Sequence, residues 1–259
     1  MSEETTEVPL LIERRGAIML ITLNRPEAMN SVNMELAQMM ADAMDELDAD
    51  DELRVGVLTG NGRGFSAGMD LKAFLTGGMP NIGDRGFAGI TERSAAKPLI
   101  AAVEGFALAG GLEIALSCDI IVGSAGAKFG IPEVGVGLFA GAGGLLRLPQ
   151  VLPRTKAMQM ALTGQPISAE EAYSLGMLAE VTEKGEALGR ALELAEVIAG
   201  NAPLGVMASK DLIQRGALMS DADFYAAQAP EITRVFGSED AVEGPSAFAE
   251  KRKPNWSGR

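Results

Sequence analysis

The chain has 259 residues, 47% of them hydrophobic, which is enough for one large domain or for one domain with an appended lobe. Its 35 acidic and 22 basic residues give a formal net charge of −13, which argues against a protein dedicated to nucleic acid. The absence of histidine excludes Ser-His-Asp and Cys-His catalysis, and a single cysteine excludes thiolate zinc clusters and an internal disulfide.

The beginning of the chain is acidic. Residues 1–9 read MSEETTEVP and contain no apolar stretch, so we expect no signal peptide. No apolar run in the sequence approaches the ~18 residues that a membrane span requires, so we expect no membrane partner. A single cysteine fits a reducing compartment, and we therefore expect a cytoplasmic protein.

Strands and helices alternate over the first part of the chain. Buried strands are predicted at residues 17–23, 55–59, 99–103 and 120–122, and helices at 32–47 and from 110 toward 118. Either Asn30 or Ser31 would cap the first helix. Residues 76–90 are rich in glycine and poorly periodic, which predicts a mobile covering loop. The alternation predicts an α/β fold with largely parallel strand pairing.

Helical spacing dominates after about residue 145. The predicted helices are residues 156–162, 169–175, 186–199, 204–214, 221–236 and 238–250. Ser168 and Glu171 form a capping box at the start of the second of these helices, and Gly176 would end it. We divide the chain into a core domain, residues 1–200, and a C-terminal helical oligomerisation lobe, residues 201–259.

Two familiar motifs occur without the context that they require. Residues 64–68 (GFSAG) match the GxSxG nucleophile elbow, but without histidine Ser66 lacks its usual base, and the alternative is a tight turn after a strand. Residues 135–140 (GVGLFA) match a dinucleotide fingerprint, but they follow a proline and a glutamate rather than a clean strand. We therefore predict neither a serine nucleophile nor a bound dinucleotide.

Two glutamates lie inside glycine-rich segments. Glu113 ends the segment 105–113 (GFALAGGLE), and Glu133 lies in the segment 130–144 (GIPEVGVGLFAGAGG). A glycine before a helix exposes backbone N–H groups, and apolar surroundings raise the pKa of a carboxyl. Together these features predict an oxyanion site with an acid/base pair. Spacing alone, however, favours two surface acids, one of them stabilising a helix dipole.

Five segments in order carry a resemblance to a known family. They are residues 23–26 (LNRP), 64–72 (GFSAGMDLK), 97–113, 129–133 (FGIPE) and 143–149 (GGLLRLP). Over nearly its whole length the chain resembles the crotonase family, the enoyl-CoA hydratase/isomerase superfamily. The resemblance implies an α/β fold, namely a crotonase-like core of repeated ββα units with a helical C-terminal lobe. It also implies assembly as a homotrimer or hexamer.

The resemblance also implies roles for residues in the glycine-rich segments. The backbone N–H groups of Met69 and Gly110 would bind the thioester carbonyl oxygen as an oxyanion hole. Glu113 would hold and deprotonate a water molecule for attack at C3, and Glu133 would deliver a proton to C2. The context of five family segments reverses the preference for surface acids, and we expect both glutamates to be catalytic.

Further residues are similar to family positions that line the CoA and substrate site. They are Arg25, Ala28, Ala67, Gly68, Asp70, Leu71, Lys72 and Phe139. Taken alone, Lys72 fits an ordinary solvated charge equally well, and Asp70 is more often a residue that fixes a turn. The preferred acyl group stays open, because Met69 is bulkier than the alanine common in relatives and Ala140 replaces a common proline.

The activity that the resemblance implies is an enoyl-CoA hydratase. It would add water reversibly across the C2=C3 bond of a trans-2-enoyl-CoA, with the coenzyme A thioester as substrate, and without metal or other cofactor. Alternatives on the same fold are an enoyl-CoA isomerase, a crotonobetainyl-CoA hydratase or carnitinyl-CoA dehydratase, and an acyl-CoA hydrolase. A non-catalytic acyl-CoA binder or RNA binder is a further alternative, although the acidity counts against RNA and the paired glutamates against an inactive enzyme.

Overall fold

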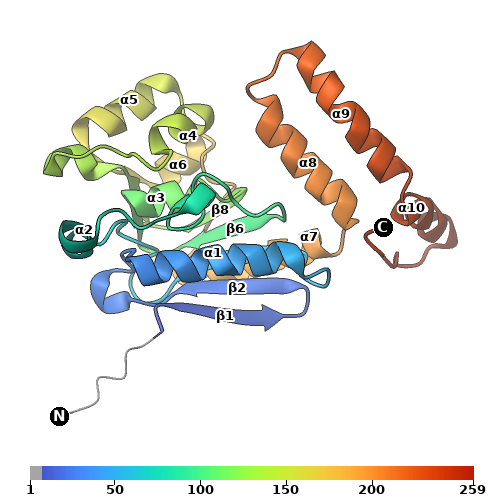
Figure 1. The fold of residues 1–259 in the computed structure, drawn as a ribbon, viewed down its shortest axis with the longest axis horizontal. Coiled ribbons are helices and arrows are strands. Elements are labelled where there is room, and N and C mark those ends of the chain that lie inside the picture. The colour runs from blue at the N-terminus through green and yellow to red at the C-terminus, as the bar shows by residue number, and fades with distance from the viewer. Residues whose placement is uncertain (1–7) are drawn as a thin grey trace, which may run out of the picture.

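The computed structural model describes residues 8–259, so most of the N-terminal segment expected to lack a signal peptide lies outside the described residues. A six-stranded sheet forms the centre of the molecule (Figure 1). Its order is β1 (Leu10–Arg15), β2 (Ile18–Leu23), β3 (Val55–Gly60), β6 (Leu99–Val103), β8 (Ile120–Ser124) and β11 (Glu180–Thr182). All neighbouring pairs are parallel except β1 with β2, which confirms the predicted α/β architecture.

One edge strand was not predicted. In β1 only Leu10 is buried and the other five residues are exposed, so its sequence LLIERR has no alternation of apolar and polar residues to indicate a strand. The strand forms because Gly16, at φ +60°, turns the chain back and pairs β1 with the buried strand β2. Tertiary pairing therefore decides this element.

Two long helices cover the two faces of the sheet. Helix α1 (Met34–Ala49) packs its buried leucine and methionine side chains into the larger core cluster. Helix α7 (Ala187–Ala199) buries three alanines at every fourth position, which lets it approach the other face closely. The residue that caps α1 is Asn33, whose side chain accepts the Leu36 N–H at 2.9 Å, so the prediction of Asn30 or Ser31 was wrong.

Asn30 has a different structural role. Its backbone is left-handed, at φ +54°, and its buried side-chain amide donates to the backbone oxygens of Asn61, at 2.8 Å, and Gly64, at 2.9 Å. These bonds join the turn after β2 to the turn after β3. Asparagine tolerates the left-handed region and carries a side-chain donor, which explains why it stands here rather than at the helix start.

A smaller layer of structure lies against the carboxyl ends of the central strands. It contains the sheet of β10 (Ile167–Ser168), β9 (Lys128–Gly130) and β7 (Phe106–Leu108), and the pair of β4 (Asn81–Ile82) and β5 (Gly86–Phe87). The short helices beside it are α2 (Leu71–Gly77), α3 (Gly110–Ala115), α4 (Gly144–Val151), α5 (Arg154–Thr163) and α6 (Ala169–Ser174). Three 3-10 turns complete it: η1 (Pro26–Ala28), η2 (Gly83–Arg85) and η3 (Pro132–Val136).

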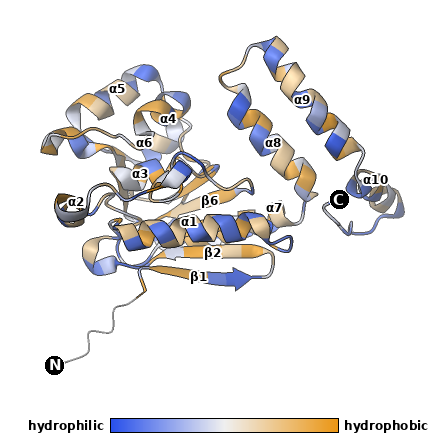
Figure 2. Cartoon of the chain, viewed as in Figure 1, coloured by the Kyte–Doolittle hydropathy of each residue, from blue (hydrophilic) through white to orange (hydrophobic). Residues whose placement is uncertain are grey.

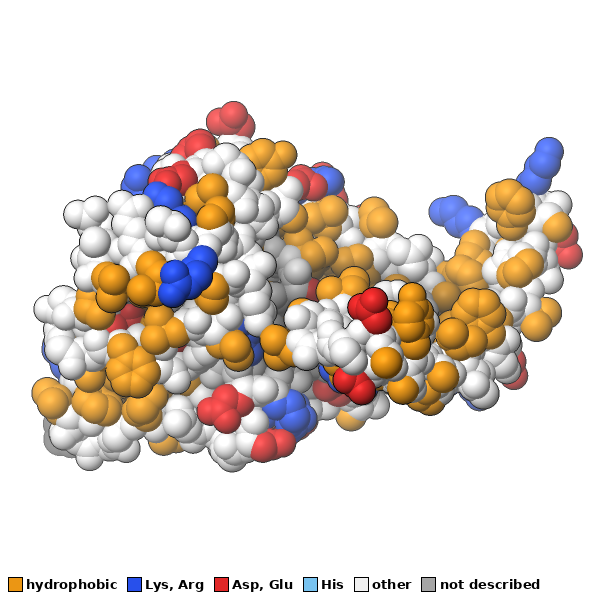
Figure 3. Space-filling view, turned by 90° about the horizontal axis from the view of Figure 1, so that it is seen from above, with side chains coloured by type: hydrophobic (Ala, Val, Ile, Leu, Met, Phe, Trp, Pro, Cys, Tyr) orange, Lys and Arg blue, Asp and Glu red, His pale blue; other side chains and the backbone are white. Residues whose placement is uncertain are grey.

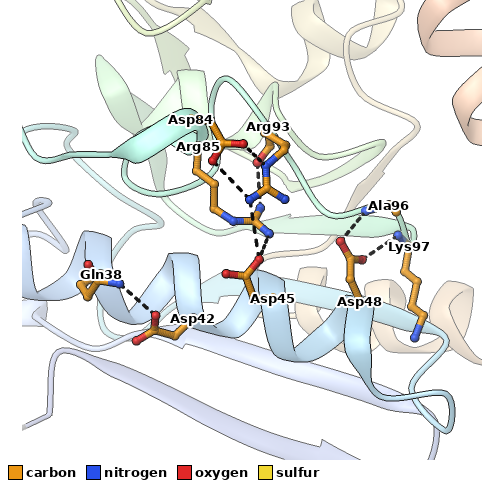
Figure 4. A network of polar contacts seen from close by, with 9 residues as sticks. All are labelled: Gln38, Asp42, Asp45, Asp48, Asp84, Arg85, Arg93, Ala96 and Lys97. Carbon is orange, nitrogen blue, oxygen red and sulfur yellow. Dashed lines mark hydrogen bonds and ion pairs between the residues drawn. The ribbon is translucent and has the colours of Figure 1, made fainter.

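The second part of the predicted covering loop, residues 76–90, is packed, because residues 85–90 are buried, whereas most of residues 76–84 are exposed. Phe87, Ala88 and Ile90 are buried, and α1 holds this part of the chain with its acidic side chains (Figure 4). Asp45 pairs with Arg85, which is only 2% exposed, and Asp48 accepts the backbone N–H of Lys97 at 3.1 Å. The expectation of a loose cover is therefore wrong for residues 85–90, because ion pairs absent from any local pattern anchor them.

The last three helices project from the core as a separate arm (Figure 1). Helices α8 (Pro203–Gly216) and α9 (Asp221–Phe236) lie side by side, and α10 (Glu239–Glu250) packs on α9. The predicted helices after residue 145 all form, within two residues of their predicted ends. The domain boundary at residue 200 stays a prediction. Figure 2 shows hydrophobic residues recurring along the exposed length of these helices.

The capping box at residue 168 forms in part. Ser168 accepts the N–H of Glu171 at 3.2 Å, as predicted, but the Glu171 carboxylate pairs with Lys156 at 2.7 Å.

Within residues 8–259 no single helix is long and apolar enough to cross a bilayer, and the one helix pair that passes by composition, α7 with α8, is bent by 113°.

Candidate active site

A cavity of about 410 Å³ lies between α2, the end of β5, α3 and the segment around η3. Most of the predicted catalytic and substrate residues line it: Ala67, Met69, Leu71, Gly110, Glu113, Glu133 and Phe139. These residues come from three separate parts of the sequence, 67–71, 110–113 and 133–139, so the fold gathers them at one place. The cavity is where the predicted chemistry would occur.

Two backbone segments meet at one wall of the cavity. Gly68, at φ +91°, lies so close to α3 that a Cβ atom on it would be 2.6 Å from the Gly110 nitrogen. Gly111 approaches the same segment, because a Cβ there would be 2.2 Å from the Ser66 oxygen. Among residues 8–259, neither the Met69 N–H nor the Gly110 N–H has a protein acceptor. Two unpaired amides from adjacent segments are the elements of an oxyanion hole.

The residue before α3 has an unusual backbone. Ala109 has φ +52° and ψ −132°, a conformation that costs a residue with a Cβ about 1–3 kcal/mol. Its N–H donates to the Gly130 oxygen at 2.9 Å, and its own oxygen accepts the N–H groups of Leu112 and Glu113. These bonds hold the strained turn, which sets the direction in which the first N–H groups of α3 point.

Glu113 is almost fully buried, at 3% exposure, in the first turn of α3. Its Oε1 atom accepts the Ala142 N–H at 2.7 Å and the Gly144 N–H at 2.8 Å. Burial raises the pKa of the Glu113 carboxyl, and the two hydrogen bonds and the nearby Arg147 oppose that rise. The carboxylate is therefore held by one oxygen, and these contacts partly offset the cost of burying its charge, which suits a base.

Glu133 lies in the first turn of η3 and faces the same cavity. Burial, with a smaller contribution from the charge of Glu113, raises the pKa of the Glu133 carboxyl to about 7. Its Oε2 atom is buried and has no hydrogen-bond partner among the described residues. A carboxyl with this pKa exchanges protons readily at neutral pH, which is the property required of a general acid.

The model of the family described as enoyl-CoA hydratase/isomerase matches residues 13–259. The chain belongs to this family. An enoyl-CoA hydratase from Mycobacterium marinum is 52% identical to it, with a TM-score of 0.95, and the match covers 98% of this chain and 100% of that one. A carnitinyl-CoA hydratase from Mycobacterium avium is 43% identical, with a TM-score of 0.77 and the same coverage. A carnitinyl-CoA dehydratase of Salmonella enteritidis is 42% identical over 258 residues, 96% of this chain and 98% of that protein.

Five residues that the family resemblance placed at the CoA and substrate site do not line the cavity: Arg25, Ala28, Gly68, Asp70 and Lys72. Asp70 caps α2 by accepting the N–H groups of Lys72 and Ala73, and it pairs with Arg25 at 3.0 Å. It therefore fixes a turn, the alternative open for it. The Lys72 side chain is exposed. Contact of these residues with CoA stays a prediction.

The loop that binds Glu113 was not foreseen in this enoyl-CoA hydratase/isomerase family member. This loop, residues 141–144, lies between Glu113 and the half-buried side chain of Arg147. The Arg147 side chain donates to the Thr91 oxygen at 2.5 Å. A Cβ on Gly144 would be 3.0 Å from the Glu113 Oε1 atom, so glycine allows the close approach. The density of glycines in residues 141–144 was a signal for this contact. Phe87 forms the floor of the cavity beside Gly110. No signal in the sequence indicated this contact, because it joins segments that are far apart in the chain.

The serine motif has a structural role in this family member. Ser66 is fully buried, its hydroxyl donates to the Asn30 oxygen at 2.8 Å, and it accepts the Gly68 N–H at 3.1 Å. The turn lies just before the motif, at residues 62–63, and Ser66 itself forms a parallel bridge with Ala107. Residues 135–140 form the end of η3, a turn at Gly137 and a segment without regular structure, rather than a strand followed by a helix. The dinucleotide fingerprint therefore has no structural counterpart.

Proposed function

We propose that the protein is an enoyl-CoA hydratase, which adds water reversibly across the C2=C3 bond of a trans-2-enoyl-CoA. The observation that carries the proposal is the convergence of Glu113 and Glu133 on one cavity whose wall holds the free N–H groups of Met69 and Gly110. Acid, base and oxyanion donors are the three requirements of this reaction.

The proposed reaction begins with water between the two carboxyls. Glu113 takes a proton from the water, and the oxygen attacks C3 of the enoyl group. The electron pair of the C2=C3 bond moves toward the thioester oxygen, where the N–H groups of Met69 and Gly110 stabilise the enolate. Each such donor contributes about 3 kcal/mol. Glu133 then donates its proton to C2, and the reverse steps dehydrate the product.

The test is to follow the loss of enoyl-thioester absorbance with the Glu113→Gln and Glu133→Gln variants. We expect the rate to fall by about 10²–10⁴-fold in each, because each variant loses a proton-transfer group. Glu35→Gln is the matched control, since Glu35 is an exposed glutamate in the first turn of α1. Unchanged rates in both active-site variants would exclude the mechanism.

A second candidate is the related reaction on a trimethylammonium substrate, the interconversion of crotonobetainyl-CoA and carnitinyl-CoA. The names of two similar relatives favour it. The enoyl-CoA isomerase and acyl-CoA hydrolase alternatives would use the same amide pair. Product analysis separates all of these, because a hydratase yields a 3-hydroxyacyl thioester, an isomerase a shifted double bond, and a hydrolase free CoA.

The proposed enzyme uses no metal or cofactor beyond its CoA thioester substrate, and proton transfer by the two carboxyls supports this. It is further proposed to be cytoplasmic and to assemble as a homotrimer or hexamer through its C-terminal helices. The exposed apolar side chains of that arm support the assembly; they include Ile213, Leu218, Phe236 and Phe248. The net charge of −13 speaks against RNA as a partner.

A further inference from the structure

The active-site cavity is lined mostly by hydrocarbon. Apart from Glu113 and Glu133, the lining side chains are apolar, and three of them are the aromatic rings of Phe74, Phe87 and Phe139. No lysine or arginine of residues 8–259 lines this cavity. Beyond its reacting carbons, a bound acyl group would therefore contact rings and aliphatic chains rather than polar partners.

The mouth of the cavity keeps large apolar side chains in water. Phe139 is 68% exposed, Val136 is 63% exposed and Met79 is 43% exposed, although all three line the cavity. Phe87, at the floor, is 3% exposed. The apolar lining thus continues from the buried floor to the surface. A hydrocarbon chain that follows it outward would remove these exposed groups from water, which is favourable in proportion to the area covered.

The cavity is also larger than a short acyl group requires. Its volume of about 410 Å³ corresponds to roughly a dozen water molecules, at ≈ 30 Å³ for each water in the liquid. A methylene is similar in size to a water molecule, so a crotonyl group would occupy only a small part of this space, and the remainder is available to the thioester arm and to a longer acyl chain. Each additional methylene that covers apolar wall in this space would add favourable binding free energy.

A trimethylammonium group would find few of its usual partners here. Such cations bind against the faces of aromatic rings, most strongly tryptophan, then tyrosine or phenylalanine. The single tryptophan, Trp256, and the two tyrosines, Tyr173 and Tyr225, are absent from the cavity lining. Among the described residues the aromatic rings in contact are those of Phe224 and Tyr225, on α9, so the three cavity phenylalanines form no stacked cage.

We infer that the site selects 2-enoyl-CoA thioesters with an unsubstituted apolar acyl chain of about eight carbons or more, over crotonyl-CoA and over trimethylammonium-bearing thioesters. This inference rests on the proposed hydratase function and names its substrate class. Phe139 and Val136 are the specificity-determining residues, because they are the most exposed apolar side chains of the lining, which a longer chain would cover.

The test measures kcat/KM for hydration of crotonyl-, hexenoyl-, octenoyl- and decenoyl-CoA, and of the trimethylammonium analogue of crotonyl-CoA. We expect kcat/KM to rise about fourfold for each added methylene until the mouth is covered. Calorimetry with the saturated butanoyl to decanoyl thioesters, which cannot react, should show dissociation constants that fall by the same factor. This second readout does not depend on catalysis.

Two variants locate the effect. Phe139→Ala should lower kcat/KM for decenoyl-CoA by about tenfold and for crotonyl-CoA by much less. Leu75→Ser is the control, since Leu75 is an 82% exposed side chain of α2 that does not line the cavity, and its chain-length profile should match the wild type. A flat or falling profile, or a preference for the trimethylammonium substrate, overturns the inference while hydration itself stands. Hydration of none of these thioesters would instead overturn the proposed function.

Discussion

Glu113 and Glu133 show how surroundings separate two identical side chains. Both carboxyls have pKa values raised by burial, but Glu113 accepts two backbone N–H groups and lies near Arg147, whereas the buried Oε2 of Glu133 has no partner among residues 8–259. Hydrogen bonds to a carboxylate favour its charged form. The difference supports the proposed roles of Glu113 as the base and Glu133 as the acid.

The raised pKa of Glu133 predicts a pH-dependent cost in stability. Because its folded-state pKa is about 7, above the ordinary value of 4.5, the folded state binds the proton more tightly. The stabilisation of the folded state by this bound proton is fully present below about pH 4.5 and is lost as the pH rises to 7. At pH 8 the free energy of unfolding of the Glu133→Gln variant should therefore exceed that of wild type by about 1–2 kcal/mol, after allowance for solvent screening. Near pH 4.5 the two free energies of unfolding should be nearly equal.

Denaturant unfolding at both pH values measures this difference. Glu35→Gln, at an exposed glutamate, serves as the reference for loss of a charge alone. A Glu133→Gln variant that is less stable than wild type at pH 8 would contradict the assignment of Glu133 as a carboxyl strained by burial.

At the scale of elements, the site depends on how closely the start of α3 approaches the segment 66–69. Gly68, Gly110 and Gly111 make this contact, and an added Cβ at any of the three would meet a neighbouring atom at less than 3.0 Å. The side chain of Phe87, anchored through the residues bound to α1, closes the other side of Gly110. The amide pair is therefore positioned by packing of backbone on backbone, with no side chain between.

Gly111→Ala should separate these elements. The new Cβ would lie 2.2 Å from the backbone oxygen of Ser66, so α3 must shift, and the Gly110 N–H moves relative to the Met69 N–H. We expect kcat to fall by about 10²–10³-fold, the loss typical of one oxyanion donor. Steady-state hydration kinetics check this.

Gly189→Ala is the matched control for that substitution. Gly189 lies in α7 with no atom within 4 Å of an added Cβ, so alanine should leave kcat unchanged and stabilise the helix by about 0.5–1 kcal/mol. If Gly111→Ala retained the wild-type kcat, the proposed oxyanion hole at this contact would be wrong.

At the scale of the whole molecule, the C-terminal arm is joined to the core by a narrow set of contacts. Lys210 of α8 pairs with Asp119 at 2.8 Å and donates to the backbone oxygens of Ala95, at 2.7 Å, and Lys97, at 2.9 Å. Beyond this anchor the arm exposes large apolar side chains, among them Phe236 at 77% and Phe248 at 87%; Figure 3 shows orange patches along the projecting part. Such surfaces mark interfaces between proteins.

Phe248→Asp should weaken assembly. A charge placed in an apolar interface must lose its hydration there, so we expect the variant to elute as a smaller species than wild type, with its mass measured by light scattering. Leu75→Asp, at an equally exposed position on α2, is the control and should keep the wild-type mass. A wild-type chain that is monomeric at micromolar concentration would contradict the proposed oligomer.

The buried elements could be predicted from the sequence because their signal is local. Residues 99–103 form a strand at the predicted bounds, since a run of five buried residues follows Pro98 and needs no knowledge of its neighbours. Helix α9 likewise has its predicted ends, with Ser220 as its cap. Strand β1, the Asn33 cap and the packing of residues 85–90 were missed, because exposed strands, competing cap residues and distant ion pairs leave no local period.

By itself, the sequence determined the chemistry that is available: without histidine and with one cysteine, proton transfer falls to carboxyls, and two of them lie in glycine-rich segments. Only the tertiary structure decided which groups act together. It brought Gly110 against Gly68, placed the Ala142 and Gly144 N–H groups on Glu113, and left Glu133 facing an apolar cavity. The physical reason is that pKa values and amide alignment depend on burial and on contacts between distant segments, which no short stretch of sequence contains.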